Sequence, residues 1–370
     1  MALSKIDTTN MIEDVPQSKI DNNINFRNII INGDMSIAQR GTSFAGANDD
    51  DYTLDRFMYD ISGTDAYQFT ISQSTDVPTG QGFAKSMKFD CTTADTSLDT
   101  DNYALIHTRL EGQNLQYLKK GTSNASSLTL SFWVKSNKTG TYIAELQDND
   151  NNRVICKSYT ISSSDTWEKK TITYAGDTSG AFDNDNGNSL KLNLWLLSGT
   201  QFSSGTLATS WESRTNANRA VGQVNLADST SNEWYITGVQ LEAGTSASDF
   251  EFLPVDVNLQ RCQRYYYQFV DGINQPVGLC VGYSGVELYV HINFPTQMRT
   301  TPSLISSNNA NDFRLRLSNL DNFDNWNTIH MATNRQILIV SSSQVSLSTG
   351  QAGWCESRNS TARVAFNSEL

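Results

Sequence analysis

The sequence predicts an all-β protein with a jelly-roll-like β-sandwich followed by a smaller C-terminal β-sandwich, and three observations support this fold class. Many short segments alternate apolar and polar residues with a period of two, as strands with one buried face do. Hydrophobic residues make up 38% of the 370 residues and charged residues only 18%, a balance typical of sheets joined by polar turns. Asn, Asp, Ser and Gly recur between these segments, where turns need them. We therefore expect few helices.

The N-terminal segment differs from the rest of the chain. Residues 1–26 carry only scattered aliphatic side chains among polar and charged neighbours, too few to form a core of their own. Asn10, Pro16 and Asn25 interrupt the heptad pattern that a coiled coil would need. The regular spacing of the aliphatic residues favours an extended arm that becomes ordered against other chains, and a flexible terminus is the alternative.

Residues 27–254 contain the clearest alternating segments and are expected to form the first sandwich. In SSLTLSFWVKS (126–136) and SLKLNLWLLSG (189–199), apolar residues occupy every second position and most of the others are polar. Two further strands, each closed by a glycine turn, are expected in WEKKTITYAG (167–176) and EWYITGVQLEAG (233–244). The pattern predicts two antiparallel sheets, each with one buried face.

Residues 255–370 are expected to begin with a short linker helix and to continue as the second sandwich. Apolar residues recur at helical spacing within VDVNLQRCQRYYYQF (255–269). The segment PVGLCVGYSGVELYVHINF (276–294) is expected to be a hairpin, with every second residue from 286 to 294 on one apolar face. His291 falls on the opposite face, as a surface or interface histidine would.

Composition argues against several kinds of partner and compartment. A formal net charge of −12, without a Lys/Arg cluster, argues against nucleic acid. No segment approaches the ~20 apolar residues of a membrane-spanning helix, and the start does not resemble a secretory signal, so we expect no membrane insertion and synthesis in a cytoplasm. The cysteines are scattered and lack a CxxC spacing, so we expect reduced packing residues. They are Cys91, Cys156, Cys262, Cys280 and Cys355.

Neither a catalytic residue nor a metal ligand set is expected, because the residues that such chemistry needs are not grouped. His107, His291 and His330 are far apart and form no HExxH or HxH motif. The acidic stretches QDNDNNR (147–153) and FDNDNGNS (182–189) depart from a calcium loop at the turn glycine and are expected to be Asn/Asp-rich turns. A structural calcium is the alternative, and we expect no other cofactor and no enzymatic activity.

Two tryptophans are the candidates for a ligand-binding surface. Trp133 shares the polar side of its expected strand with Lys135, and Trp195 shares that of its strand with Lys191 and Asn193. An exposed tryptophan can stack on a sugar ring, be covered by another chain, or pack under a long surface loop. The sequence leaves these three interpretations open.

Several motifs after residue 27 resemble those of the tail-fibre and receptor-binding proteins of tailed bacteriophages, especially short-tailed phages of aquatic bacteria. The run from ITGVQLEAG (236–244) to CQRYYY (262–267) is the most specific of them. The others are NIIINGDMSIAQRGTSF (28–44), YTLDRF (52–57), SLTLSFWVKSNKTGTY (127–142), TWEKKTITYAGDTSG (166–180), FPTQMRTTPSL (294–304) and AFNSEL (365–370).

The resemblance implies a carbohydrate-binding-module-like sandwich at 27–254 and a head domain at 255–370. It also implies a homotrimer that attaches to the phage tail or an adaptor protein through an arm at 1–26, and that recognises a glycan or protein of the host cell surface. A structural protein of the virion tail, assembled in the host cytoplasm, is therefore expected.

Two other functions remain as alternatives. One is a capsid decoration protein or structural fibre without a receptor role. The other is a polysaccharide depolymerase, although the chain lacks the repeat of about 20 residues that a parallel β-helix would need.

Overall fold

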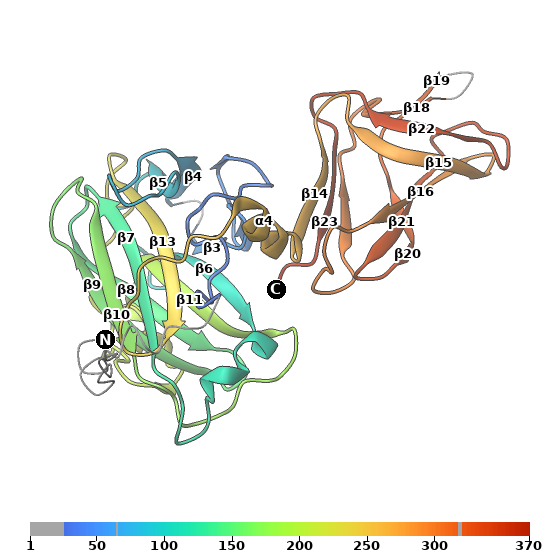
Figure 1. Ribbon diagram of the computed structural model, residues 1–370. Coiled ribbons are helices and arrows are strands. Elements are labelled where there is room, and N and C mark those ends of the chain that lie inside the picture. Colours follow the sequence, from blue (N-terminus) through green and yellow to red (C-terminus); the bar gives the residue numbers. More distant parts are fainter. Residues whose placement is uncertain (1–25, 64–65, 317–319) are drawn as a thin grey trace, which may run out of the picture. The chain divides into compact units, whose positions relative to one another are not determined.

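The computed structural model describes residues 26–63, 66–316 and 320–370, and within them it confirms the prediction of an all-β protein (Figure 1). The sheets are antiparallel, and α4 (Val255–Gln263) is the longest helix of the described residues. None of the described helices is long and apolar enough to cross a membrane. Most of the arm expected at 1–26 lies outside the described residues, so the arm stays a prediction.

The chain forms two compact units. Unit 1 contains the segment that ends at Ser36, Ser43–Asp51 and Phe57–Phe252. Unit 2 contains Ile37–Thr42, Tyr52–Arg56 and Leu253–Leu370. Two short segments inside the range 27–254 therefore belong to the second unit, a feature that no local sequence pattern indicates.

Unit 1 consists of two sheets. Sheet A has the order β1 (Ser43–Ala45), β4 (Gln68–Ser74), β5 (Ser86–Thr93), β13 (Glu233–Ala243), β7 (Leu128–Ser136) and β10 (Glu168–Tyr174). Sheet B has the order β12 (Glu212–Ser213), β9 (Arg153–Ile161), β8 (Gly140–Asp148), β11 (Asn188–Ser198), β6 (Tyr103–Glu111), β3 (Met58–Ser62) and β2 (Asp51–Tyr52). The helices α3 (Thr200–Ser203) and η3 (Asn216–Asn218) lie in the connection between β11 and β13.

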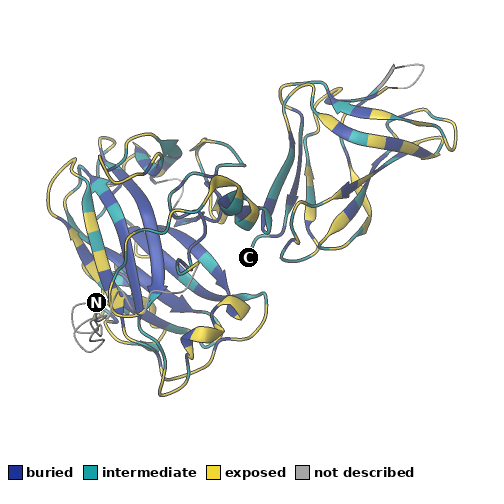
Figure 2. Cartoon of the chain, in the orientation of Figure 1, coloured by how far each residue is buried: buried dark blue, intermediate teal, exposed yellow. Residues whose placement is uncertain are grey.

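The predicted alternation places the core of unit 1 between these sheets. Aromatic side chains of the two sheets meet there: the ring centroids of Phe132 and Tyr159 are 5.0 Å apart, and those of Tyr59 and Phe89 are 5.8 Å apart. The apolar faces of the strands at 128–136 and 189–199 are buried as expected (Figure 2). The outer faces of the sheets are left to form surfaces.

Unit 2 is a second, smaller sandwich. Sheet C has the order β14 (Tyr266–Asp271), β23 (Arg363–Asn367) and β17 (Ser303–Ser306). Sheet D has the order β19 (Leu320–Phe323), β18 (Phe313–Arg316), β22 (Ala352–Ser357), β15 (Pro276–Ser284), β16 (Glu287–Asn293), β21 (Gln336–Ser342) and β20 (Thr328–Ala332). The predicted linker helix is α4, which ends before Tyr266 begins the first strand.

The hairpin of β15 and β16 confirms the predicted pairing and contributes to the core of unit 2. Leu288, Val290 and Ile292 are buried as expected, whereas Val286 lies in the turn and is exposed. The expectation that all five cysteines are reduced is wrong for one pair. A disulfide joins Cys280 to Cys355 on the neighbouring strands β15 and β22, because their side chains face the same core.

A buried ion pair fixes the C-terminus of unit 2. The guanidinium of Arg56 is fully buried and donates to Glu369, and Arg40 also donates to Glu369 at 3.1 Å. The Arg56 guanidinium lies 3.5 Å from the ring centroid of Tyr265, and that of Arg40 lies 3.7 Å from Tyr266. Motifs that are more than 300 residues apart in the chain therefore meet in one cluster.

Electrostatics within this cluster depend on Glu369. Burial works against the charged form of Arg56, but the Glu369 carboxylate outweighs it and the pKa of Arg56 is raised. Arg299 adds to the cluster because it donates to the backbone carbonyls of Ser368 at 2.7 Å and Glu369 at 2.6 Å. The charge on Arg56 is therefore tolerated only while Glu369 stays in place.

We predict that Glu369→Gln lowers the free energy of unfolding of unit 2 by about 3–5 kcal/mol, because it leaves a buried guanidinium uncompensated. Denaturant unfolding, followed by the fluorescence of the buried Trp326 in the same unit, measures this. The matched control is Glu356→Gln, which removes a carboxylate paired with the half-exposed Arg316 and should cost less than about 1 kcal/mol. Equal losses in both variants would contradict the role given to the buried pair.

Candidate functional site

The expectation that the five candidate ligand-binding residues share one polar face of the sandwich is wrong, because the structure places them on two different sheets. Trp133 and Lys135 lie on β7 in sheet A, whereas Lys191, Asn193 and Trp195 lie on β11 in sheet B. All five do project from the outer faces of their sheets, since the alternate residues of both strands fill the core. Two separate faces must therefore be considered.

Trp195 is not a platform for a ligand, because it is fully buried at 0% exposure. Its ring packs in a cluster with Phe202, Ala208 and Ala220, which come from the connection between β11 and β13. The indole Nε1 donates to Glu145 at 2.8 Å, and the Arg219 guanidinium lies 5.1 Å from the ring centroid. Of the three interpretations, packing under a long surface loop is the one that the structure supports for Trp195.

The neighbours of Trp195 on β11 belong to the same enclosed polar layer. Asn193 is buried and donates to Gln147 at 3.3 Å. Lys191 is half-buried opposite Arg109, and burial together with the charge of Arg109 lowers its pKa to about 8. This layer stabilises sheet B and its covering loop.

Trp133, in contrast, lines an open hollow on the outer face of sheet A, with a volume of about 390 Å³. Lys169 on β10 and Thr237 on β13 lie directly opposite Trp133 in the sheet. The loop that precedes β5 and the loop that follows β13 form the walls of the hollow. Besides Trp133, the hollow is lined by Gly80, Gln81, Phe83, Ser131, Lys169, Gly238, Asp249, Phe250 and Phe252.

The floor of the hollow is shaped by a bulge in β13, within the motif ITGVQLEAG. The pairing of β13 with β7 shifts register between Thr237 and Gln240, and Gly238 has a φ of +63°. A Cβ on Gly238 would lie 2.6 Å from the Phe83 ring. Gly33 approaches the same bulge, because its carbonyl accepts from the Val239 amide at 2.8 Å. Both glycines are therefore needed for the shape of this site.

Three phenylalanines form one wall of the hollow. The ring centroids of Phe83, Phe250 and Phe252 are 4.9–5.1 Å apart, in edge-on or tilted arrangements. Phe83 is buried, whereas Phe252 is 50% exposed. With the half-buried Trp133, the hollow offers apolar ring faces beside the polar side chains of Gln81, Lys169 and Asp249.

Lys135 lies next to Trp133 on the same face but takes part in a separate cluster. Its ammonium pairs with Asp76 and lies 4.3 Å from the ring centroid of Tyr235. The Trp167 indole also donates to Asp76, at 3.0 Å. Burial of Asp76 opposes its ionisation, but the hydrogen bonds from Lys135 and Trp167 outweigh this and lower the pKa of Asp76. Lys135 therefore supports the rim of the site and does not line the hollow.

In the first of the two acidic stretches, QDNDNNR (147–153), Asp148 is paired with a side-chain cation. The Lys120 ammonium lies 2.5 Å from Asp148 and 3.1 Å from Asp177, and Arg153 donates to Asp177 at 2.7 Å. Lys120 also donates to the backbone carbonyls of residues 179 and 180. Within the ranges that the structure describes, no group of three or more His, Cys, Asp or Glu side chains could hold a metal ion.

The histidines lie in both units, His107 in unit 1 and His291 and His330 on sheet D of unit 2. His107 is buried in sheet B, where its Nε2 accepts from Arg109 at 3.1 Å. His291 is exposed on sheet D, and its Nε2 lies 3.1 Å from the Gln336 amide oxygen. His330 packs against Tyr289. None of the three lines the hollow at Trp133.

Sequence reasoning found Trp133 but missed the rest of the hollow. Phe250 and Phe252 alternate in SDFEF, a pattern that could have suggested two rings on one side. Gln81 and Phe83 carry no such signal, because they lie in a loop whose path depends on the bulge at Gly238.

Comparison with known proteins gives similarity of fold only. No family model matches the sequence, and none of the curated proteins matches it. Among solved structures, the enzymatically active domain of tailspike protein 4 from bacteriophage CBA120 is similar, with a TM-score of 0.33 and 14% identity over 59% of this chain. This chain spans only 22% of that tailspike chain.

Carbohydrate-binding modules are also similar to this chain. A family 11 module from Clostridium thermocellum, in complex with a β-1,3-1,4-mixed-linked tetrasaccharide, has a TM-score of 0.29 and 12% identity, over 56% of this chain and 98% of the module. A family 61 module in complex with β-1,4-galactotriose has a TM-score of 0.29 and 12% identity, over 59% of this chain and 99% of the module. Similarities at this level do not establish a function.

We predict that the two tryptophans differ in their contribution to stability. Trp195→Ala should lower the free energy of unfolding by about 3–5 kcal/mol, because it leaves a cavity under the loop and removes the hydrogen bond from the indole to the buried Glu145. Trp133→Ala should cost about 1 kcal/mol or less, since its ring borders an open hollow. Denaturant unfolding followed by circular dichroism measures both. A Trp133→Ala loss as large as that of Trp195→Ala would mean that Trp133 is a core residue.

Proposed function

We propose that this chain is a non-enzymatic carbohydrate-binding protein of a phage tail, and that the hollow at Trp133 binds a glycan of the host cell surface. The observation that carries the proposal is the composition of the hollow. It joins the ring of Trp133 and the exposed ring of Phe252 to the polar side chains of Gln81, Lys169 and Asp249.

This combination suits the two-sided chemistry of a sugar. The C–H face of a pyranose packs on an aromatic ring, while the hydroxyl groups at its edge need hydrogen-bond partners. The hollow offers Lys169 as a donor, Asp249 as an acceptor and Gln81 as both. Its volume of about 390 Å³ lies within the range of small-ligand sites, and a few sugar units could occupy it.

The hollow also favours binding over hydrolysis. Glycoside hydrolysis commonly uses two carboxyl groups, held roughly 5 to 9.5 Å apart across the sugar. Asp249 is the only Asp or Glu among the described residues that line the hollow. A depolymerase acting at this site would lack its second carboxyl group, so we propose a site that binds without cleaving.

The finer parts of the proposal rest on the resemblance to phage tail-fibre and receptor-binding proteins. We propose a homotrimer in the virion tail, assembled in the host cytoplasm, whose arm at residues 1–26 attaches to the tail or to an adaptor protein. A capsid decoration protein or a structural fibre without a receptor role is the competing function. Neither would need a hollow with aromatic and polar side chains.

We predict that Trp133→Ala weakens binding of the matching oligosaccharide about tenfold, or about 1.4 kcal/mol, by removing a stacking surface. An array of bacterial surface oligosaccharides identifies the ligand, and calorimetry then gives the dissociation constant. The matched control is Tyr117→Ala, which removes an exposed ring of unit 1 that does not line the hollow and should bind as the native chain does.

The array and the calorimetry also separate this proposal from its alternatives. Unchanged binding by Trp133→Ala would mean that the hollow is not the site. An array on which the native chain binds nothing would favour the structural fibre. Release of reducing ends from the bound oligosaccharide would favour the depolymerase.

A further inference from the structure

The outer face of sheet D in unit 2 is unusually apolar for a surface. On β15, alternate side chains project outward, and Leu279, Val281 and Tyr283 are 75%, 47% and 67% exposed. Met331 on β20 is 64% exposed, and Trp354 on β22 is 42% exposed. We call the outer surface of β22, β15, β16, β21 and β20 the apolar face. A soluble protein rarely leaves so much contiguous apolar surface without a partner.

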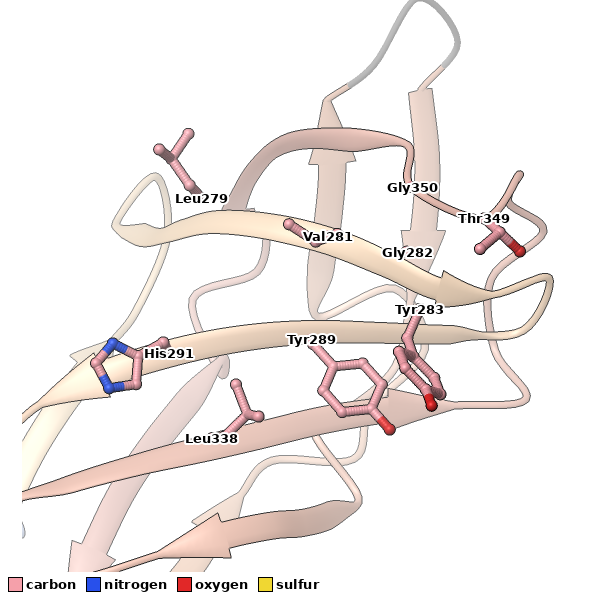
Figure 3. Close-up of a pocket in the computed structure, with 9 residues that line it drawn as sticks. All are labelled: Leu279, Val281, Gly282, Tyr283, Tyr289, His291, Leu338, Thr349 and Gly350. Atoms are coloured by element: carbon pink, nitrogen blue, oxygen red, sulfur yellow. The ribbon is translucent and has the colours of Figure 1, made fainter.

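Cross-strand pairing makes these side chains contiguous. Leu279 lies opposite Trp354, and Val281 lies opposite both Ala352 and Tyr289. Farther along the sheet, Leu338 lies opposite both His291 and Met331. Figure 3 shows Tyr283 and Tyr289 side by side, with ring centroids 5.2 Å apart. The face is therefore a continuous strip across five strands.

Two hollows of about 470 and 520 Å³ indent this strip and share His291 and Leu338. Figure 3 shows the first of them. None of the described residues that line either hollow is Asp, Glu, Lys or Arg. The ion pair of Arg316 with Glu356 lies on β18 and β22, at the margin of the strip. The two hollows are thus uncharged on a chain with a formal net charge of −12, and Glu287 lies at the end of β16.

The lack of charge argues for one kind of occupant. The aliphatic side chains of Leu279, Val281 and Met331 are exposed on the face and offer the hydroxyl groups of a glycan no hydrogen-bond partner. A lipid surface would favour Lys or Arg beside the apolar residues, and the hollows have none. Another copy of this chain carries the same net charge of −12, and contact through the uncharged hollows brings no further like charges together. Self-association is therefore the contact that this face suits best.

The size of the face is also adequate. Neighbouring strands lie about 4.8 Å apart and rise about 3.3 Å per residue, so five strands of about seven residues span roughly 20 by 23 Å. The accessible area of such a corrugated surface exceeds its projection of roughly 460 Å², and approaches the ~800 Å² that each partner contributes to a standard interface.

We propose that the apolar face of sheet D is an interface between copies of this chain, in which it packs on the same face of the other copies. The inference rests on the homotrimer of the proposed function and assigns the surface that holds it. In a closed assembly the other copies cover this face, and this explains why it is exposed in a single chain.

The test is the mass in solution of full-length native protein and of two variants, measured by analytical ultracentrifugation at micromolar concentration. Leu279→Glu and Met331→Glu each place a carboxylate on the face, on different strands. Because both native side chains are largely exposed in the single chain, each variant should fold with native circular dichroism. We expect the native protein to be an oligomer and each variant to sediment with the mass of one chain.

The matched control is Ile273→Glu, which makes the same kind of change at an exposed residue between β14 and β15, away from the hollows. It should remain an oligomer. Oligomeric Leu279→Glu and Met331→Glu would overturn the assignment of the interface, and so would a monomeric native protein or a monomeric control.

Glycan binding by the monomeric variants separates this inference from the proposed function. Calorimetry should give them the native dissociation constant for a short oligosaccharide, since the hollow at Trp133 lies in the other unit. Variants that are monomeric but still bind the oligosaccharide support the proposed interface. If the native oligomer does not bind the oligosaccharide, that result counts only against the glycan site.

Discussion

A strand in a two-layer sandwich can use only one of its faces for the core, and this constraint determines where function can lie in the protein. The alternate residues of β7 and β11 that do not fill the core project from the outer faces of two different sheets. On sheet B a long connection covers that face and encloses Trp195. On sheet A the loops rise only at its margins and leave Trp133 beside an open hollow. On sheet D the described loops leave the corresponding face exposed.

Unit 2 depends on a second constraint, the cost of burying a charge. Arg56 is fully buried, and the cluster around it draws on five motifs: SIAQRG, LDRF, RCQRYYY, QMRTTP and FNSEL. Each supplies a charge, a ring or a carbonyl that the buried guanidinium or its partner Glu369 needs. The motifs that carry the resemblance to phage proteins at both ends of the chain therefore have a structural explanation within one unit.

The sequence could predict the strands, the linker helix and the inward or outward direction of most side chains, because these follow from local periodicity. It could not predict which sheet a strand joins, and this is why Trp133 and Trp195 were expected on one surface. Nor could it predict the Cys280–Cys355 disulfide, since the partners lie 75 residues apart and meet only through the pairing of β15 with β22. The run GLCVGY at 278–283 is apolar on both faces of its strand. This pattern indicates that the outer face also has a contact, but it does not say with what.

The central claim is that the chain binds a glycan through Trp133, and 19F NMR of protein labelled with 5-fluorotryptophan tests it most directly. The sequence contains seven tryptophans, so seven resonances report on both units. During titration with the oligosaccharide selected on an array, the resonance of Trp133 should move, while those of the enclosed Trp195, Trp234 and Trp326 should stay in place. Shifts confined to Trp354, or a Trp133 resonance unchanged at saturation, would contradict the account.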